Sequence, residues 1–236
     1  MLDVDGTLID IAPTPQSVHV PEQLRHDLRE LGTLTDGATA LVSGRPLRDL
    51  DRLFGPLGIA LVGGHGAERR IWRDGVPHED RTPRLAESVR QRCIKLASAS
   101  DKILLEDKGY SIAIHYRLAP EFEQTVRDAA AAIVADTGSG KLAVMHGKAV
   151  VEIKHAGLSK GSGIRALMAQ APFAGRRPVF VGDDITDEDA FAAMPDFGGI
   201  AFSVGRTVAG AIRRFETPAD VRQWIAQICR SKSQPG

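Results

Sequence analysis

The chain has 236 residues, of which 43% are hydrophobic and 25% are charged, a composition typical of globular proteins and not of disordered or fibrous ones. Its 30 Lys and Arg balance its 30 Asp and Glu, so a formal charge of zero gives no electrostatic reason to expect nucleic acid or an acidic membrane as a partner. Its two cysteines, Cys93 and Cys229, lie far apart, no apolar run approaches the roughly 20 residues of a membrane span, and the first residues show no signal-peptide pattern, so we expect a cytoplasmic monomer.

The first part of the chain alternates helical and strand patterns. Apolar residues recur at helical spacing over residues 24–31, and short apolar runs at residues 39–42 and 59–62 predict buried strands. Strands that alternate with helices predict a parallel sheet with helices on its faces.

The middle of the chain has a different order, in which each of two helices is followed by a hairpin. Its elements in chain order are a helix at 83–99, strands at 102–106 and 110–117 around the turn Asp107-Lys108-Gly109, a helix at 121–135, and strands at 141–145 and 149–154 around the turn His146-Gly147-Lys148. This order predicts a small α+β unit with an antiparallel sheet.

The last part of the chain returns to the first pattern, with a helix at 161–171, a strand at 178–181 and a helix at 219–229. We therefore expect an α/β fold with a Rossmann-like parallel-sheet core made of residues 1–81 and 156–236. Residues 82–155 would form an inserted α+β unit with an antiparallel sheet and two helices.

Four polar clusters carry the candidate chemistry, and three of them directly follow an apolar run. Ligands of open α/β sheets bind at the carboxyl ends of the strands, so we expect the clusters to form one site. The first cluster is Asp3-Val4-Asp5-Gly6-Thr7-Leu8. Its two carboxylates suit a nucleophile, Asp3, and a general acid/base, Asp5, although Asp and Gly are also common in simple turns.

The second cluster, Ser43-Gly44-Arg45, offers a hydroxyl, backbone amides and a guanidinium to a phosphoryl group, but before Pro46 it can also be a helix N-cap. The third is Lys160, at the start of a predicted helix, which can neutralise a phosphoryl group during transfer. A lone lysine is more often a solvated side chain, so the interpretation of Lys160 depends on the other clusters.

The fourth cluster, Gly182-Asp183-Asp184-Ile185-Thr186-Asp187-Glu188, follows a predicted buried strand. Clustered carboxylates at a strand end favour a hard cation with oxygen ligands, and Mg²⁺ there would reduce the repulsion between Asp3 and an anionic phosphate. The alternative interpretation is an acidic helix start, which the helix dipole favours.

The four clusters, in their order along the chain, resemble the four motifs of the haloacid dehalogenase-like phosphatases, and the set spans nearly the whole chain. The resemblance implies that Asp3 is the nucleophile, that Asp5 is the general acid/base, and that the phosphoryl group is held by Ser43 and Lys160. It also implies a Mg²⁺ site built from Asp3, the backbone carbonyl of Asp5, Asp183 and Asp184. The inserted unit would be a cap.

Within that superfamily the sequence is most similar to the trehalose-6-phosphate phosphatases. The segments that carry this similarity are residues 5–13, Ser43-Gly44-Arg45, Gly64-His65-Gly66-Ala67-Glu68, Glu106-Asp107-Lys108-Gly109, Val151-Glu152-Ile153 and residues 182–188. The resemblance implies two sets of substrate contacts, one in the core and one that binds sugar hydroxyls from the cap: Thr7, Gly44, Arg45 and His65, and then Glu106, Lys108 and Glu152.

Three of these assignments have other interpretations from the residues alone. Residues 107–109 are also typical of a charged hairpin turn, and His65 of an ordinary loop histidine. Glu152 lies on an apolar strand, where a charged group needs a partner or a ligand.

The predicted function is Mg²⁺-dependent hydrolysis of trehalose 6-phosphate, a small sugar phosphate, through an aspartyl phosphate in trehalose biosynthesis. One alternative is a phosphatase for another sugar phosphate, such as a sucrose or hexose phosphate, because the core motifs do not distinguish among these. A second is an inactive protein that binds a sugar phosphate or a partner. This second alternative is motivated by the N-terminus, where only Met1 and Leu2 precede Asp3 and are too few for a full central strand. We therefore expect that the true start lies upstream, that the chain is cut, or that it is damaged.

Overall fold

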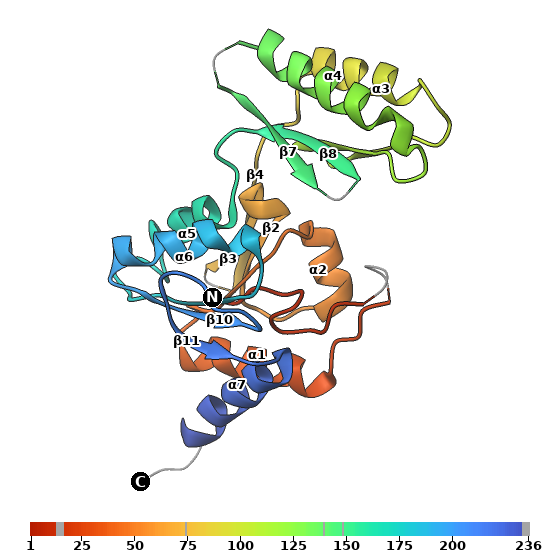
Figure 1. Ribbon diagram of the computed structural model, residues 1–236. Helices are drawn as coiled ribbons and strands as arrows, with labels where there is room; N and C mark the ends of the chain where they lie inside the picture. Colours follow the sequence, from red (N-terminus) through yellow and green to blue (C-terminus); the bar gives the residue numbers. More distant parts are fainter. Residues whose placement is uncertain (13–16, 74, 139, 148, 233–236) are drawn as a thin grey trace. The chain divides into compact units, whose positions relative to one another are not determined.

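The computed structural model describes residues 1–12, 17–73, 75–138, 140–147 and 149–232 (Figure 1). Pro13 and Lys148, which belong to two of the sequence motifs above, lie outside the described residues. The chain divides into two compact units. The first joins Met1–Arg81 to Ser159–Gly236, and the second comprises Thr82–Leu158.

The first unit is built on a mixed sheet with two halves. One half has the order β1-β2-β3-β4, in which β1 (Ala40–Val42) and β2 (Ala60–Gly63) are parallel, and β3 (Glu68–Arg73) and β4 (Val76–Arg81) form an antiparallel hairpin. The other half has the order β11-β10-β9 and is parallel throughout: β9 (Val179–Gly182), β10 (Ile200–Val204) and β11 (Ala211–Phe215).

Residues 1–3 join the two halves of this sheet. Leu2 forms parallel bridges with Leu41 of β1 and with Val181 of β9. The Leu2 amide donates to the Ala40 carbonyl at 2.9 Å, and the Asp3 amide donates to the Val181 carbonyl at 2.9 Å. The segment makes isolated bridges rather than a long ladder, but it lies in the middle of the sheet and brings Asp3 to the carboxyl ends of both neighbours.

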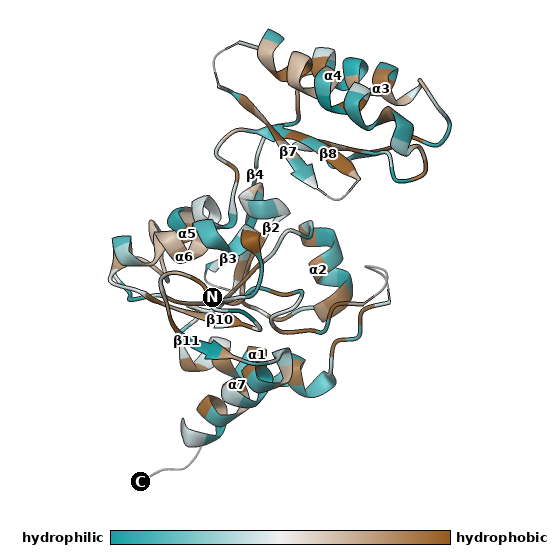
Figure 2. Ribbon diagram, viewed as in Figure 1, coloured by the Kyte–Doolittle hydropathy of each residue, from teal (hydrophilic) through white to brown (hydrophobic). Residues whose placement is uncertain are grey.

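Helices cover both faces of this sheet, because successive strand residues point to opposite sides. Leu41 belongs to a buried cluster with residues of α1 (Glu22–Leu34), α2 (Leu47–Phe54) and α7 (Pro218–Lys232). Ala40 and Val42 belong to a second cluster with residues of α5 (Lys160–Met168) and α6 (Glu188–Ala193). Figure 2 shows hydrophobic and hydrophilic stretches mixed along α1 and α7, as expected of helices that bury one face.

Short 3-10 helices lie in the connections of both units. They are η1 (Gly64–Gly66), η2 (Pro120–Phe122), η3 (Ile185–Asp187) and η4 (Pro195–Phe197). Of these, η1 directly follows β2, and η3 follows β9 after Asp183 and Asp184, so both shape the loops at the carboxyl ends of these strands.

The second unit is an antiparallel sheet with two helices on one face. The sheet has the order β5-β6-β8-β7, and its elements are β5 (Leu104–Asp107), β6 (Ser111–His115), β7 (Leu142–Gly147), β8 (Val150–His155), α3 (Glu87–Ala97) and α4 (Glu123–Asp136). Ile112 and Ile153 pack against the helices with Val126 and Ala130. Glu152, one residue before Ile153, therefore faces the other side of the sheet.

The predicted fold class, a parallel-sheet α/β core with an inserted α+β unit, is confirmed by the fold. The second compact unit runs to Leu158, whereas the predicted insertion runs to residue 155, and two hydrogen bonds lie in the residues between these limits. The Ala156 amide donates to the Lys141 carbonyl at 2.9 Å, and the Lys154 ammonium donates to the Leu158 carbonyl at 2.7 Å. Among the helices of the described ranges, none has the length and apolar character needed to cross a membrane.

Candidate active site

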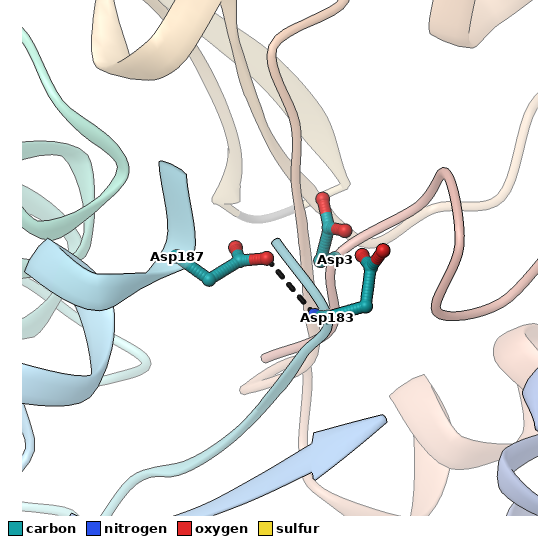
Figure 3. A group of neighbouring side chains, drawn as sticks. All are labelled: Asp3, Asp183 and Asp187. Atoms are coloured by element: carbon teal, nitrogen blue, oxygen red, sulfur yellow. Dashed lines mark hydrogen bonds between the residues drawn. The ribbon is translucent and has the colours of Figure 1, made fainter. Parts of the chain in front are cut away.

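Three of the four polar clusters meet at one edge of the first unit's sheet. Asp3 follows the bridge at Leu2, Ser43 follows β1, and Asp183 follows β9, which are neighbouring parallel segments. Figure 3 shows Asp3 close to Asp183 and Asp187, although Asp3 comes from the start of the chain and the other two come from the segment after β9. The placement at the carboxyl ends of parallel strands agrees with the position at which α/β sheets bind ligands.

The Asp3 carboxylate is held at both of its oxygens. Asp3 is only 2% exposed. The Lys160 ammonium donates to Asp3 Oδ1 at 2.6 Å. The Thr7 hydroxyl lies 3.2 Å from Asp3 Oδ2 and 3.1 Å from Asp183 Oδ1, so its one hydrogen can be donated to either carboxylate. Thr7, a predicted substrate contact, thus orients the two acidic side chains.

Lys160 is buried, so it is not the solvated lysine of the alternative interpretation. It is 3% exposed and is the first residue of α5. A capping box fixes this helix start: the Ser159 hydroxyl accepts from the Ser162 amide at 3.1 Å, and the Ser162 hydroxyl accepts from the Ser159 amide at 3.0 Å. The Lys160 ammonium also donates to Asp187 Oδ1 at 2.7 Å.

Asp187 is a site residue to which the sequence motifs gave no role of its own. Its side chain is fully buried, and Oδ2 accepts from the amides of Asp183 and Asp184 at 3.0 Å each. The Asp184 side chain is exposed and instead accepts from the Ile185 amide at 2.6 Å, as the cap of η3. The spacing of Asp187, four residues after Asp183 and within the acidic cluster, was the available signal.

The site has an excess of buried negative charge. Burial raises the pKa of the Asp3 carboxyl to about 7, although attraction by Lys160 offsets part of the effect. Burial, and then the charge of Asp3, raise the pKa of Asp187 to about 6. Burial also raises the pKa of Asp183. Burial alone would lower the pKa of Lys160, but attraction by Asp3 and Asp187 outweighs it and raises that pKa, so the lysine stays charged.

The acidic side chains fit a divalent cation. Among the described residues, Asp3, Asp183 and Asp187 each offer a carboxylate oxygen, and these oxygens lie within 4.8 Å of one another. One lysine does not balance three acids, and carboxylate oxygens are the protein ligands that Mg²⁺ prefers. This group contains two of the predicted metal ligands, Asp3 and Asp183, and it includes Asp187.

Asp5 is separated from this group and is paired with Arg45. The Arg45 guanidinium donates from Nε to Asp5 Oδ2 and from Nη2 to Asp5 Oδ1, both at 2.6 Å. Such a two-bond pair fixes the orientation of the carboxylate. Ser43 is 1% exposed, and its hydroxyl accepts from the Arg45 amide at 3.1 Å. Ser43 is not the N-cap of α2, because Pro46 occupies that position.

Two backbone positions explain why glycines flank these groups. Gly6 has a φ of +78°, and a Cβ there would lie 2.1 Å from Asp183 Oδ2. A Cβ on Gly44 would lie 2.5 Å from His65 Nε2, so the His65 ring lies directly against Gly44. His65 itself has a φ of +54°, which is strained for a residue with a side chain.

The remaining predicted residues lie in the second unit. Glu152 is 8% exposed, and its Oε1 accepts from the Ser111 hydroxyl at 2.5 Å and from the Lys108 ammonium at 3.4 Å. These two contacts supply the partner that a charge on an apolar strand needs. Glu106 lies two strands from Glu152 and contacts His115 Nε2 at 3.3 Å. Lys108 and Glu152 are therefore brought together, while Glu106 pairs with His115.

Comparisons with known proteins point to one family. The family model described as trehalose-phosphatase matches residues 1–212. The chain is 40% identical over 233 residues to the trehalose-6-phosphate phosphatase of Escherichia coli K12, covering 98% of this chain and 86% of that protein. It is 41% identical over 211 residues to the probable trehalose-phosphate phosphatase of Sinorhizobium fredii, covering 88% and 77%.

Solved structures agree with this fold. One of the Aspergillus fumigatus trehalose-6-phosphate phosphatase structures, crystal form 3, matches with a TM-score of 0.69 and 26% identity over 98% of this chain and 92% of that one. A haloacid dehalogenase-like hydrolase from Bacteroides thetaiotaomicron matches with a TM-score of 0.70 over 96% and 97%, and at 15% identity this likeness concerns the fold alone.

Proposed function

Because the chain belongs to the trehalose-phosphatase family, we propose that it hydrolyses trehalose 6-phosphate to trehalose and inorganic phosphate, with Mg²⁺ as cofactor. It is a phosphoric monoester hydrolase, as its relatives are. The observation that carries the mechanism is the buried Asp3 carboxylate, whose Oδ1 accepts from Lys160 while Oδ2 lies beside the Thr7 hydroxyl.

In the first step of the proposed reaction, an Asp3 oxygen attacks phosphorus. The bond from phosphorus to the sugar oxygen breaks as the bond to Asp3 forms. Asp5 enters this step protonated and gives its proton to the sugar oxygen, so trehalose leaves as an alcohol.

In the second step, Asp5 acts as the base. It takes a proton from a water molecule, the water oxygen attacks the phosphorus of the aspartyl phosphate, and the bond to Asp3 breaks. Phosphate leaves, and Asp3 and protonated Asp5 are restored. The Arg45 pair suits Asp5 in its carboxylate form, which is the form that begins this step.

Asp3, Asp183 and Asp187 are the residues that would hold Mg²⁺, and the Asp5 carbonyl stays a predicted further ligand. A bound divalent ion would neutralise charge between the incoming phosphate and Asp3. Lys160 and Ser43 would hold the phosphoryl oxygens, as donors that are already buried and oriented.

The second unit would recognise the sugar. Lys108 and Glu152 offer a donor and an acceptor side by side, and Glu106 adds a second carboxylate on the same sheet. Such groups suit the hydroxyls of a disaccharide without a large apolar surface. Gly44 and His65 remain predicted contacts of the core.

The test is phosphate release from trehalose 6-phosphate, with Mg²⁺ and with EDTA, beside glucose 6-phosphate and sucrose 6-phosphate. We expect release that depends on the metal and is selective for the trehalose ester. Release mainly from another ester would keep the reaction and overturn the substrate. Release from none of the three would contradict the proposed function.

A further inference from the structure

Glu68 takes no part in the reaction proposed above, yet it belongs to the segment 64–68, which contacts the loop of residues 43–47 at several points. This loop contains Ser43 and Arg45. The Gly64 amide donates to the Arg45 carbonyl at 2.8 Å, and the His65 amide donates to the Ser43 carbonyl at 3.1 Å. The Glu68 carboxylate accepts from the Leu47 amide at 2.7 Å. Residues 64–68 therefore bind this loop from its first residue to its last.

Of the three bonds just described, the bond from the Leu47 amide to Glu68 involves a charged side chain, and the other two join backbone atoms. Leu47 is the first residue of α2, where a helix has amides without partners in the helix. A carboxylate satisfies such an amide with a charge-assisted bond and also interacts favourably with the helix dipole. Glu68 is only 7% exposed, and its Oε1 lies 3.5 Å from Arg81 Nη1, so each of its carboxylate oxygens has a partner.

The loop has little room to shift without losing these contacts. A Cβ on Gly63 would lie 2.8 Å from the Arg45 carbonyl oxygen and 2.9 Å from the Leu47 nitrogen. The backbones thus touch, and Glu68 fixes the residue at which the loop ends and α2 begins. Arg45, in the middle of the loop, then reaches Asp5 with two bonds of 2.6 Å.

We propose that Glu68 is a positioning residue: it holds the 43–47 loop so that Arg45 keeps the Asp5 carboxylate oriented for proton transfer. The inference rests on the proposed function, since it assigns a support to the residue that acts there as acid and base. Glu68 acts through Arg45 and does not contact the reacting atoms.

Kinetics of three variants test this role. Glu68→Ala removes the acceptor for the Leu47 amide, and we expect kcat to fall on the order of 10–100-fold. Glu68→Gln keeps an acceptor oxygen, and we expect its kcat within about three-fold of the unmodified protein. Asp80→Ala is the matched control, because it removes an ion pair with Arg69 on the same hairpin and leaves the contact between Arg81 and Glu68 in place, and it should leave kcat unchanged.

A double-mutant cycle separates positioning from a general loss of stability. If Glu68 acts through Arg45, the pair Arg45→Ala and Glu68→Ala should lose no more than about three-fold in kcat beyond Arg45→Ala alone. Multiplied losses, an unaffected Arg45→Ala variant, or a Glu68→Gln variant as impaired as Glu68→Ala would each overturn the proposal. If Glu68→Ala does not fold, Glu68→Asp serves, because its shorter side chain cannot keep both contacts.

A crystal structure of the Glu68 variant decides the question without activity. We expect residues 43–47 displaced and the bonds from Arg45 to Asp5 lost. An unchanged loop with both bonds intact would overturn the positioning role. If the unmodified protein hydrolyses none of the esters, the proposed function fails, and this structure still decides the role of Glu68.

Discussion

The Asp3 carboxylate is only 2% exposed, and one of its oxygens accepts a hydrogen bond from the buried Lys160. The substitution Asp3→Asn keeps the shape of the side chain but removes the nucleophilic charge. We expect kcat to fall at least about a thousand-fold, with the melting temperature close to that of the unmodified protein, because Lys160 keeps Asp187 as partner. Phosphate release and thermal unfolding of both proteins are the measurements, and substantial turnover by the variant would contradict the assignment of Asp3.

Asp187 and Asp184 form a matched pair for a second prediction. Asp187→Asn removes a buried carboxylate from the acidic group and weakens a bond to Lys160, so we expect Mg²⁺ affinity to fall about 10–100-fold. Asp184→Asn changes an exposed cap of η3 and should leave that affinity within a few-fold. Titration with Mg²⁺, followed by thermal shift, compares them. Equal losses in both variants would show that the metal is held differently.

At this scale the sequence was a good guide to which residues gather but a poorer guide to what each one does. Asp3, Ser43, Lys160 and Asp183 follow from strand ends and motif spacing. The role of Asp187 depends on the turn at η3, which brings its side chain to the amides of Asp183 and Asp184. The spacing of apolar residues does not predict such a turn. Glu68 was likewise part of a recognised segment, but its bond to Leu47 joins residues from two loops.

The turn at Gly6, which follows residues 1–3 in the middle of the sheet, has no room for an added Cβ atom. Gly6→Ala would place a Cβ 2.1 Å from Asp183 Oδ2 at a φ of +78°, so Asp183 must move. We expect the free energy of unfolding to drop by about 1–3 kcal/mol, with a loss of Mg²⁺ affinity. Urea unfolding and metal titration measure the two effects.

Gly55→Ala is the control for this prediction. Gly55 has a similar φ of +66°, but a Cβ there would have no atom within 4 Å. It should lower stability through backbone strain alone and leave metal affinity unchanged. A Gly6 variant that behaved like the Gly55 variant would contradict the close approach to Asp183.

The strands that could be predicted from the sequence are those with an unbroken run of buried apolar residues. All three residues of β1 and all four of β2 are buried, and both lie within the predicted ranges or one residue beyond. The hairpin of β3 and β4 was missed because every residue of β4 is exposed and β3 has few apolar residues, so neither shows alternation. β10 carries an apolar run that the same reasoning could have found.

For the whole molecule, stability and metal binding should be linked through pH. The folded-state pKa values of Asp3 and Asp187, about 7 and about 6, lie above the ordinary aspartate value of 3.8. The folded protein therefore binds more protons than the unfolded chain between about pH 4 and pH 7, and its stability without metal should fall as pH rises through that window. A cation must displace these protons, so Mg²⁺ affinity should rise over the same window.

Thermal unfolding with and without Mg²⁺ measures this linkage. We expect the metal to raise the melting temperature more at about pH 8 than at about pH 5.5, because less of the acidic group is protonated at the higher pH. Replacing Mg²⁺ with EDTA should abolish the difference. An equal shift at both pH values would contradict the raised pKa values.

The place of residues 1–3 between β1 and β9 also has a consequence for biosynthesis. A ribosome makes Leu2 long before Val181, and the whole second unit is translated between the two partners of the central segment. A nascent chain can pair Leu2 with Leu41 early, but Asp3 meets Lys160 and Asp183 only after these later residues have emerged. Translation products that stop before Asp183 should therefore hydrolyse no phosphate ester in the cell, because Asp3 then lacks part of the acidic group.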